Sequence, residues 1–396
     1  MARTLDIAIA GAGIAGLAAA ILLRRDGHSV TVFDRFDAPA PVGSGLMLQE
    51  TGLAVLAALG LREAMQALGE PIYRLHGKSV PGDRTVLDVR FKALSPDLSG
   101  YGVQRRALFD LLLEGAEACG AALVPGTDIQ GQSAGLLSDR KGRQLGPFDV
   151  VVDALGARSP LSSRPKSELP YGALWTTLPW PEDGPFDPTA LEQRYENASK
   201  MAGVMGSGRA SPDQPRTATY FWSLRRGAYT AWRRAPLDHW KAEAAALWPE
   251  TAGLLDLITD HDQLAFARYR HRTHPKPVEH RCVHIGDSWH AASPQLGQGA
   301  NMALLDAYAL AKALREHSHL EDGLAGYGYL RQRHVAIYQW MTWAFTPVYQ
   351  SQSRILPLLR DGLAAPLSRV PPAPQVLAAM VSGAVGRPLK ALGLVA

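Results

Sequence analysis

Three glycines near the N-terminus form the first group of residues with a recognisable chemical use. Gly11, Gly13 and Gly16 have the spacing GxGxxG and lie between an apolar segment and a segment rich in Ala and Leu. In such a turn the first glycine permits a tight bend, the second lets the backbone approach a pyrophosphate, and the third lets helix and strand pack closely. Asp34 ends the next apolar segment, about 20 residues on, where a carboxylate can accept hydrogen bonds from a ribose. The pattern predicts a dinucleotide site for either NAD or FAD.

A second segment, far downstream, distinguishes between the two dinucleotides. Residues 286–301 read GDSWHAASPQLGQGAN and lead into a helical pattern. A carboxylate such as Asp287 at a strand end can bind the hydroxyls of a ribityl chain, and a helix N-terminus stabilises negative charge on the N1–C2=O edge of a reduced flavin. A site that needs a segment this far away suits the long, folded FAD better than NAD. His290 is a candidate proton carrier, and a structural hydrogen bond explains it equally well.

Apolar periodicity predicts the elements that would position both segments. Strands at 5–10 and 29–34 flank a helix at 17–25, which makes one βαβ unit. Further helices are expected at 53–68, 106–119 and 300–316, and further strands at 122–129, 148–154 and 282–285. This alternation predicts an α/β fold with a Rossmann-like FAD-binding domain.

From about residue 165 the chain becomes rich in aromatic, strand-like segments, at 171–180, 217–224 and 228–234, while residues 181–215 are rich in Pro, Gly and Ser. We therefore expect a discontinuous FAD-binding domain (1–164 and 282–330), an inserted β-sheet substrate domain (165–281) and a C-terminal helical segment (331–396) broken at its prolines, Pro347 among them. Trp175, Tyr220 and Trp222 alternate along the candidate strands and are candidate pocket residues for a large apolar substrate.

Net charge, cysteine positions and apolar segments argue against several other classes of function. The formal net charge is +4, too small to argue for nucleic acid. Cys119 and Cys282 are far apart, so a disulfide framework, a metal site and a dithiol centre are not indicated, and a cytoplasmic protein is expected. No membrane-spanning segment is expected, although the apolar residues 355–395 leave peripheral contact with a membrane as an option. The oligomeric state does not follow from the sequence.

Taken together, three motifs resemble the single-component FAD-dependent aromatic hydroxylases, the 4-hydroxybenzoate hydroxylase-like flavoprotein monooxygenases. They are the GxGxxG turn with its acidic strand end, an R-x-x-L pattern formed by Arg105 and Leu108, and the segment that starts at Gly286. The matching blocks span residues 5 to about 315. The resemblance implies contacts between FAD and a set of residues at these motifs: Gly11, Gly13, Ile14, Ala15 and Gly16 at the pyrophosphate, Asp34 and Arg35 at the adenosine, Arg105 and Asp287 at the ribityl-pyrophosphate, and Gly297, Gly299, Ala300 and Asn301 along the isoalloxazine. Pro294 would lie over the flavin on the substrate side.

One segment departs from the pattern of these hydroxylases. They usually carry an Asp-Gly pair followed by x-x-S, which is assigned to the interplay of FAD and NAD(P)H. Here Gly156 and Ser159 fit, but Leu155 stands where the aspartate is expected, and Asp153 lies two residues earlier. The departure concerns the reductant more than FAD.

The resemblance implies a monooxygenase that uses NADH or NADPH and O₂ to oxygenate an apolar, aromatic small molecule through a flavin C4a-hydroperoxide. No catalytic base follows from spacing alone. Two alternatives stay open: an FAD-dependent reductase or dehydrogenase of an isoprenoid or quinone-type substrate, and a non-catalytic flavoprotein.

Overall fold

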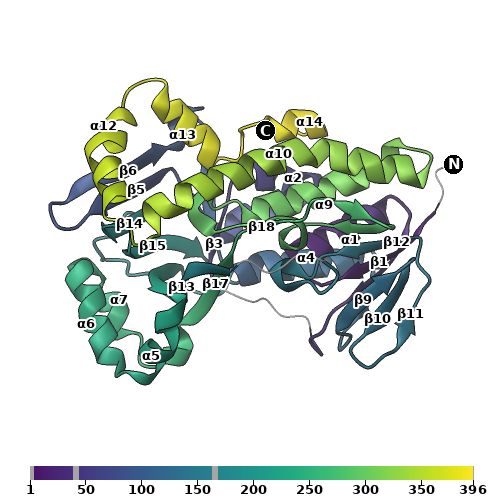
Figure 1. The fold of residues 1–396 in the computed structure, drawn as a ribbon, viewed down its shortest axis with the longest axis horizontal. Helices are drawn as coiled ribbons and strands as arrows, with labels where there is room; N and C mark the ends of the chain where they lie inside the picture. The colour runs from purple at the N-terminus through teal and green to yellow at the C-terminus, as the bar shows by residue number, and fades with distance from the viewer. Residues whose placement is uncertain (1–3, 39–43, 163–167, 396) are drawn as a thin grey trace.

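Two large sheets organise the molecule, which is described by a computed structural model over residues 4–38, 44–162 and 168–395 (Figure 1). The predicted domain boundary near residue 165 falls outside these ranges. The first sheet has six strands, in the order β19 (Val278–Glu279), β20 (Cys282–His284), β12 (Val150–Asp153), β1 (Asp6–Ala10), β2 (Ser29–Phe33) and β8 (Ala122–Val124). All neighbours are parallel except the edge pair β19–β20. The predicted α/β fold is confirmed.

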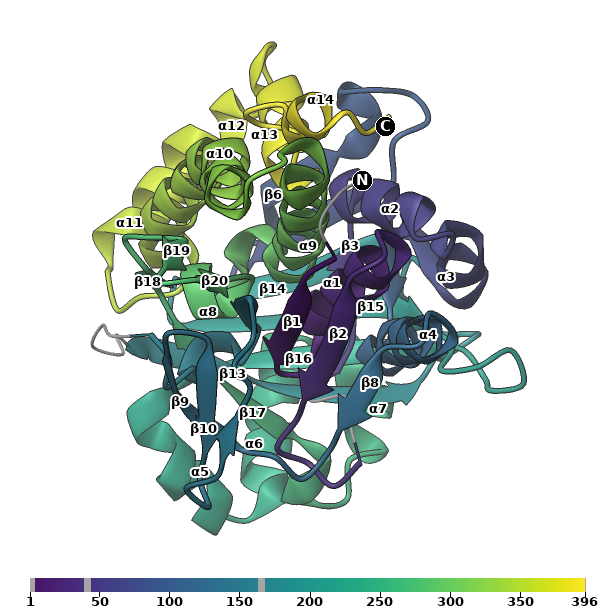
Figure 2. The ribbon, with the colours of Figure 1, turned by 90° about the vertical axis from the view of Figure 1, so that its right-hand side faces the viewer.

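Alternating side chains send the two faces of this sheet into different cores. Ile7, Ile9 and Val152 face three helices, whereas Ala8 and Val151 face a small antiparallel sheet (Figure 2). The helices are α1 (Ile14–Arg25), α4 (Arg105–Ala118) and α9 (Gly299–Glu316), and the small sheet consists of β9 (Ile129–Ser133), β10 (Leu136–Asp139) and β11 (Gln144–Leu145). Both faces are therefore covered, as a parallel sheet requires.

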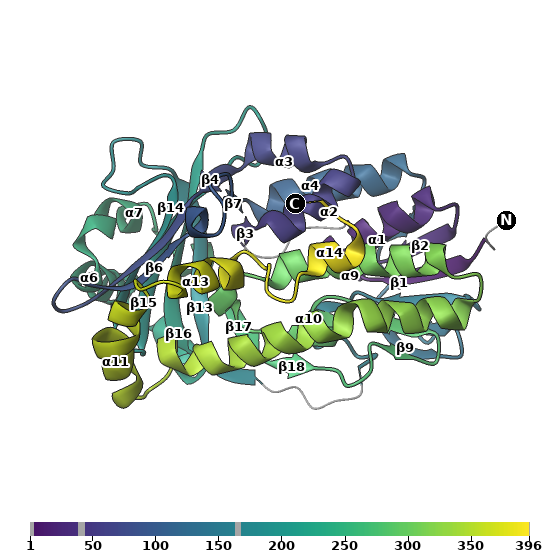
Figure 3. The same ribbon diagram turned by 90° about the horizontal axis from the view of Figure 1, so that it is seen from above.

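The second sheet has seven strands and draws them from two parts of the chain. Its order is β17 (Ala265–Arg270), β13 (Glu168–Pro179), β16 (Thr217–Arg225), β15 (Lys200–Gly208), β14 (Ala190–Glu196), β5 (Arg74–Ser79) and β6 (Arg84–Arg90). β14 pairs with β5 in parallel. Two strands of the predicted FAD-binding range 1–164 thus belong to the sheet assigned to the substrate domain. With that change, the division into domains stays a prediction. A second small sheet, β3 (Leu46–Leu48), β7 (Gly100–Val103) and β4 (Glu70–Ile72), lies between the two large ones (Figure 3).

Several predicted elements are wrong in detail. The helix expected at 53–68 is two helices, α2 (Glu50–Ala58) and α3 (Arg62–Leu68), because Gly60 turns the chain at φ +70°. The strand expected at 122–129 ends at Val124, and Ile129 already begins β9. Residues 181–215, rich in turn formers, contain the central strands β14 and β15.

The strand expected at 228–234 is the helix α5 (Tyr229–Arg234). Tyr229 stacks on Phe266 with ring centroids 4.5 Å apart, and Trp232 meets Trp240 edge to face. Residues three apart share one face of a helix, so packing outweighs the local β propensity of this aromatic segment. α5 forms a layer with α6 (Leu237–Leu247) and α7 (Ala252–Asp256) on one face of the seven-stranded sheet.

A long helix, α10 (Leu320–Tyr349), runs from the six-stranded sheet to the seven-stranded one (Figure 3). It continues through Pro347, where a break was expected. It is followed by α11 (Ile355–Leu359), α12 (Ala365–Leu367), α13 (Ala373–Val381) and α14 (Pro388–Leu392). Among the described residues, no helix is both long and apolar enough to cross a bilayer. Large apolar side chains are nevertheless exposed on this C-terminal part: Trp340, Trp343, Ile355, Leu358, Leu359, Leu363 and Leu367.

Tyr220 and Trp222 lie in the core beneath α5–α7, with exposed fractions of 0% and 2%. The Tyr220 hydroxyl has no hydrogen-bond partner within the described residues. We expect Tyr220→Phe to leave the free energy of unfolding unchanged or to raise it by about 1 kcal/mol, because a desolvated hydroxyl is removed. Trp222→Ala should lower it by about 3–5 kcal/mol through a cavity. Urea unfolding measures both, and a large loss in Tyr220→Phe would contradict this account.

Candidate functional site

The glycine turn between β1 and α1 is shaped by close contacts of the backbone. Gly11 has φ +108°, and a Cβ there would lie 2.5 Å from the carbonyl oxygen of Ala154. A Cβ on Gly16 would lie 2.0 Å from the carbonyl oxygen of Gly11, so helix and strand could not approach as they do. A Cβ on Gly13 would meet nothing within 4 Å, and no side chain caps α1 at this residue. The turn thus leaves uncapped N–H groups facing open space, which suits a phosphate.

Asp34 lies beside this turn, as the sequence predicts. Its Oδ2 accepts a hydrogen bond from the backbone N–H of Ala12 (2.8 Å), and its Oδ1 accepts one from Phe36 (3.0 Å). The carboxylate is therefore fixed at the end of β2. Arg35 is exposed, and its guanidinium lies 4.7 Å from the ring centroid of Phe36.

Arg105 and Asp287 are opposite charges that lack hydrogen-bond partners. Nε of Arg105, the first residue of α4, is buried without a partner, and the Asp287 carboxylate forms no hydrogen bond with any described residue. Burial lowers the pKa of Arg105, and the negative charge of Asp287 offsets only part of this lowering. Desolvation by the surrounding protein also raises the pKa of Asp287, although His290, Arg105 and Arg272 act in the opposite direction. The buried Nε of Arg105 costs free energy unless a ligand satisfies it, while the exposed carboxylate of Asp287 is open to a ligand.

Arg272 is a further cation of this kind that sequence reasoning missed. Its Nη2 donates to the carbonyl of Ser288 (2.9 Å), while its Nε and Nη1 have no partner in the part of the chain that the structure describes. In the sequence, Arg272 is one of several basic residues between positions 268 and 281. Such clusters are usually solvated loops, so this one did not identify Arg272 as a site residue.

The N-terminus of α9 presents a second set of unpaired amides. Gly297 adopts a left-handed conformation (φ +64°), and a Cβ on Gly299 would meet nothing within 4 Å. No side chain caps the helix, so the first-turn N–H groups of Gly299, Ala300 and Asn301 are available to a ligand. The Asn301 side chain is engaged elsewhere, because its Oδ1 accepts from the N–H of Gln49 (2.9 Å) and its Nδ2 donates to the carbonyl of Met47 (3.2 Å). It links the start of α9 to β3.

The Asp306 side chain in α9 fixes the segment between Gly286 and His290 by contacts at both of its ends. The Asp306 carboxylate accepts from the N–H of Gly286 (2.8 Å) and from Nε of Arg331 (2.7 Å), and it is 2.6 Å from Nε2 of His290. Burial alone would raise the pKa of Asp306, but His290 and Arg331 together hold it below its ordinary value. His290 is 4% exposed and bound to this carboxylate. This contact is the structural hydrogen bond expected as one of the two alternatives, and the role of His290 as a proton carrier stays a prediction.

The structure does not bring Asp153 to the place of the aspartate that Leu155 replaces. Asp153 is fully buried at the end of β12, where it accepts from Ser159 Oγ (2.7 Å) and from the N–H of Leu155 (3.1 Å). It also lies 2.8 Å from Nδ1 of His284. Its carboxylate is committed to these neighbours and does not stand in for the missing one.

The three predicted pocket aromatics do not share a face. Trp175 opposes Phe221 across β13 and β16, and their rings stack 4.7 Å apart on the face of the sheet opposite to α5–α7. Tyr269 joins them by accepting a hydrogen bond from Trp175 Nε1 (3.2 Å). Tyr220 and Trp222 point the other way, so their prediction as pocket residues is wrong. Phe221, one residue from each, was missed because the sequence alone does not show which residues of the strand face the Trp175 side of the sheet.

The Trp175 face is directed toward the segment that begins α9. A Cβ on Gly45 would lie 2.1 Å from Thr219 Oγ1 of this face, and Met47, two residues on, packs with Met205 of β15. A Cβ on Gly297 would be 3.4 Å from Met47 Cε. Pro294, which begins a short 3-10 turn, is exposed in this region.

These residues fit FAD by three independent observations. Open space borders Gly13 and Gly299, two helix N-termini lack caps, and Arg105 and Arg272 have buried polar atoms without partners among the described residues, beside the exposed carboxylate of Asp287. A diphosphate, a ribityl chain and a flavin edge supply the complementary groups.

We expect Asp287→Asn and Arg105→Met each to raise the dissociation constant of FAD at least tenfold, about 1.4 kcal/mol, because each removes a charged group that is open to the ligand and has no hydrogen-bond partner among the described residues. Quenching of FAD fluorescence measures the constant. Arg106→Met is the matched control, since Arg106 is exposed and pairs with Asp110. Equal constants in all variants would show that these charges face away from the cofactor.

His334 makes the stability of this region depend on pH. Its Nδ1 lies 2.9 Å from Nη1 of Arg331, and burial and that cation lower its pKa to about 3. In the unfolded chain its pKa is about 6.5, so the unfolded state binds more protons between these values, and the free energy of unfolding falls as the pH decreases from 6.5 toward 3.

We expect His334→Gln to flatten this dependence by up to about 1.4 kcal/mol per pH unit. Urea unfolding between pH 4 and 7 measures the slopes, with His239→Gln at an exposed position as the control. Parallel slopes in wild type and His334→Gln would refute the assignment.

Comparison with known proteins agrees with the geometry. A family model described as an FAD binding domain matches residues 4–145 and 190–337. The putative FAD-dependent monooxygenase YetM of Bacillus subtilis is 27% identical over 338 residues, which cover 81% of this chain and 87% of YetM. Aurachin C monooxygenase/isomerase of Stigmatella aurantiaca is 26% identical over 358 residues, covering 84% and 86%.

Solved structures show the same fold. 2-Methyl-3-hydroxypyridine-5-carboxylic acid oxygenase superposes with a TM-score of 0.76 at 20% identity, covering 93% of this chain and 98% of that one. PqsL of Pseudomonas aeruginosa, in complex with 2-aminobenzoylacetate, has a TM-score of 0.76 at 21% identity, covering 89% and 99%. The resemblance seen in the sequence is confirmed: the chain belongs to the FAD binding domain family and is an FAD-dependent monooxygenase.

Proposed function

We propose that this monooxygenase uses NADH or NADPH and O₂ to oxygenate an apolar aromatic molecule. The observation that carries the proposal is the aromatic face of Trp175, Phe221 and Tyr269, which belongs to the same side of the sheet as Thr219 and Met205, next to Met47 and the turn before α9. Aromatic and thioether side chains there favour a flat apolar ring over a highly charged substrate. Relatives include a 3-amino-4-hydroxybenzoate 2-monooxygenase from Streptomyces cremeus, 24% identical over 335 residues, whose name specifies an aromatic substrate.

Bound FAD supplies the redox chemistry and the activation of O₂. The chain's own residues position it: we assign the pyrophosphate to the turn at Gly13, the ribityl chain to Asp287, and the edge of the ring system to the N–H groups at Gly299 and Ala300. Pro294 would separate this ring from the substrate. The N-terminus of α9 would stabilise negative charge on the reduced ring, and the packed Met47 and Met205 would help to exclude water.

A groove beside the Trp175 face supports entry of such a substrate. It has a volume of about 590 Å³, lies between the start of β13 and the end of α10, and is lined by Tyr171, Arg225, Trp343 and Pro347 among others. Tyr171 and Trp175 are an even number of residues apart on β13 and so share a face. An apolar ligand entering here would reach the aromatic pair along one strand.

Two further assignments belong to this proposal. A cytoplasmic setting is supported by Cys119 and Cys282, neither of which forms a disulfide. Peripheral contact with a membrane stays a prediction, and the exposed apolar side chains of α10 to α12 support it.

Activity should be tested with the FAD-loaded protein. Anaerobic addition of NADH or NADPH should bleach the flavin spectrum, faster with a suitable phenol from a panel, and O₂ uptake should then match product formation. Bleaching with product but without O₂ uptake would favour a reductase, and a flavin that neither nucleotide reduces would favour a non-catalytic flavoprotein. The latter result would show that the leucine at position 155 matters.

We expect Trp175→Ala to raise KM for the aromatic substrate at least tenfold, because the stacked face loses its largest ring. The dissociation constant of FAD should not change. Steady-state kinetics and FAD titration measure the two quantities, and Tyr329→Ala, at a residue 87% exposed, is the control. An unchanged KM would place the substrate elsewhere.

A further inference from the structure

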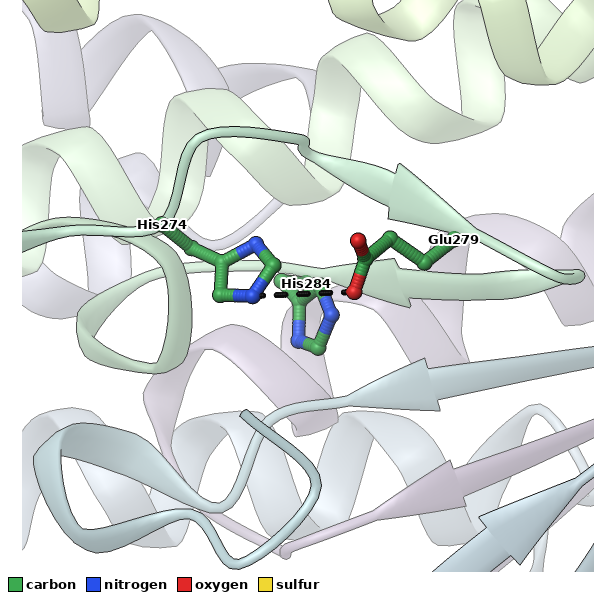
Figure 4. Close-up of side chains that lie close together, drawn as sticks. All are labelled: His274, Glu279 and His284. Atoms are coloured by element: carbon green, nitrogen blue, oxygen red, sulfur yellow. Dashed lines mark ion pairs between the residues drawn. The ribbon is translucent and has the colours of Figure 1, made fainter. Parts of the chain in front are cut away.

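Three potential metal ligands converge at the edge of the six-stranded sheet, outside the flavin site. His274 follows β18 (Arg272–Thr273), Glu279 ends β19, and His284 ends β20. One ligand atom from each lies within 4.8 Å of the other two, and Figure 4 shows the three side chains directed toward one another. Nε2 of His274 is 3.6 Å from Oε2 of Glu279, and the centroids of the His274 and His284 rings are 4.7 Å apart.

Hydrogen bonds at Nδ1 of both histidines leave the other ring nitrogen, Nε2, as the atom that can bind a metal ion. Nδ1 of His284 lies 2.8 Å from the Asp153 carboxylate, and Nδ1 of His274 lies 2.7 Å from the carbonyl oxygen of Lys276. Both of these partners are acceptors, and the N–H of Lys276, which is a donor, lies farther from His274 Nδ1 (3.4 Å), so we assign the proton to each Nδ1 and the lone pair to each Nε2. Histidines that bind metals are oriented in this way, with the second nitrogen donating to a carboxylate or a carbonyl.

The backbone fixes both histidines before any ion arrives. The N–H of His274 donates to Trp289 (2.7 Å), the N–H of His284 donates to Pro277 (2.8 Å), and the carbonyl of His284 accepts from the Tyr327 hydroxyl (2.9 Å). Both residues are 1% exposed. Glu279, whose side chain is 31% exposed, leaves one side of the cluster open to an ion.

We propose that His274, Glu279 and His284 form a binding site for a divalent cation of the zinc type, with water as its fourth ligand. Two imidazoles and one carboxylate are a known ligand set for Zn²⁺ and disfavour Mg²⁺ and Ca²⁺, which prefer oxygen. Ligand atoms about 2.0–2.2 Å from a tetrahedral zinc lie roughly 3.3–3.5 Å from each other. The His274–Glu279 separation is already close to this, and small rotations of the partly exposed Glu279 side chain and of the two imidazole rings would make the remaining adjustment.

The ion would stabilise the loop that carries Asp287. It would connect β19 and β20 to His274, in the segment that follows β18. Because His284 contacts the Asp153 carboxylate, the ion would also help to fix the position of Asp153. The carbonyl of Asp153 accepts from Ser288 Oγ (2.6 Å), one residue after Asp287. This is a structural role, independent of the oxygenation proposed above, so failure of either proposal leaves the other standing.

The test is a zinc titration of the untagged, FAD-loaded full chain after treatment with EDTA and dialysis. Isothermal titration calorimetry should show one Zn²⁺ per chain, and Glu279→Gln should weaken the dissociation constant at least tenfold. Glu321→Gln is the matched control, because Glu321 is 76% exposed and lies 4.0 Å from Arg281 of the same hairpin. Its affinity should equal that of the wild type.

Co²⁺ provides a second measurement that does not depend on folding of a variant. Bound to this site in the wild type, it should give the visible d–d absorption of a four-coordinate complex with nitrogen and oxygen ligands, and Zn²⁺ should displace it. Zn²⁺ but not Mg²⁺ should raise the melting temperature. Absence of stoichiometric binding, or equal affinities in the wild type and Glu279→Gln, would overturn the proposal.

Discussion

The buried carboxylate of Asp306 is the interaction on which the flavin-binding half depends. It binds the backbone of Gly286, the ring of His290 and the guanidinium of Arg331, and so joins the middle of α9 to the segment that follows β20 and to the long helix α10. A charge so far from water is tolerated only because every neighbour donates to it. The orientation of Asp287, next to Gly286, follows from this arrangement.

A second constraint is that the site consists of polar groups that the protein itself leaves unpaired. The amides at Gly13 and Gly299, Nε of Arg105 and the Asp287 carboxylate all lack partners among the described residues, whereas Asp34 and Asn301 are satisfied internally. The buried Nε of Arg105 destabilises the protein without its cofactor, and a bound FAD that pairs with it would offset this, whereas the amides and the Asp287 carboxylate are exposed and hydrated until a ligand replaces the water. Binding of FAD and stability of the fold are therefore linked.

The sequence predicted those parts of the molecule that local rules determine. The βαβ unit, the glycine turn, Asp34 and the segment from Gly286 follow from residue types whose backbone or charge has few alternative uses. The second sheet did not follow. Tyr220, Trp222 and Trp175 are all aromatic residues in strand-like segments, so the sequence does not distinguish them. Only the register across β13 and β16 shows which side of the sheet each one occupies. Likewise, packing of Tyr229 and Trp232 decided that α5 is helical. The cluster at His274 joins residues from three segments, and no spacing rule in the sequence marks it.

The parallel pairing of β5 with β14 has a consequence for how the protein can form and change. Because a strand from the first quarter of the chain completes a sheet built mainly from the middle, no single cut separates the two halves into folding units. The sheet must wait for contacts between residues distant in sequence, which slows folding and keeps strand edges exposed until late synthesis. Exchange of the substrate-binding sheet between relatives would therefore require two coordinated segments, because recombination at one junction would pair β5 with a β14 from a different relative.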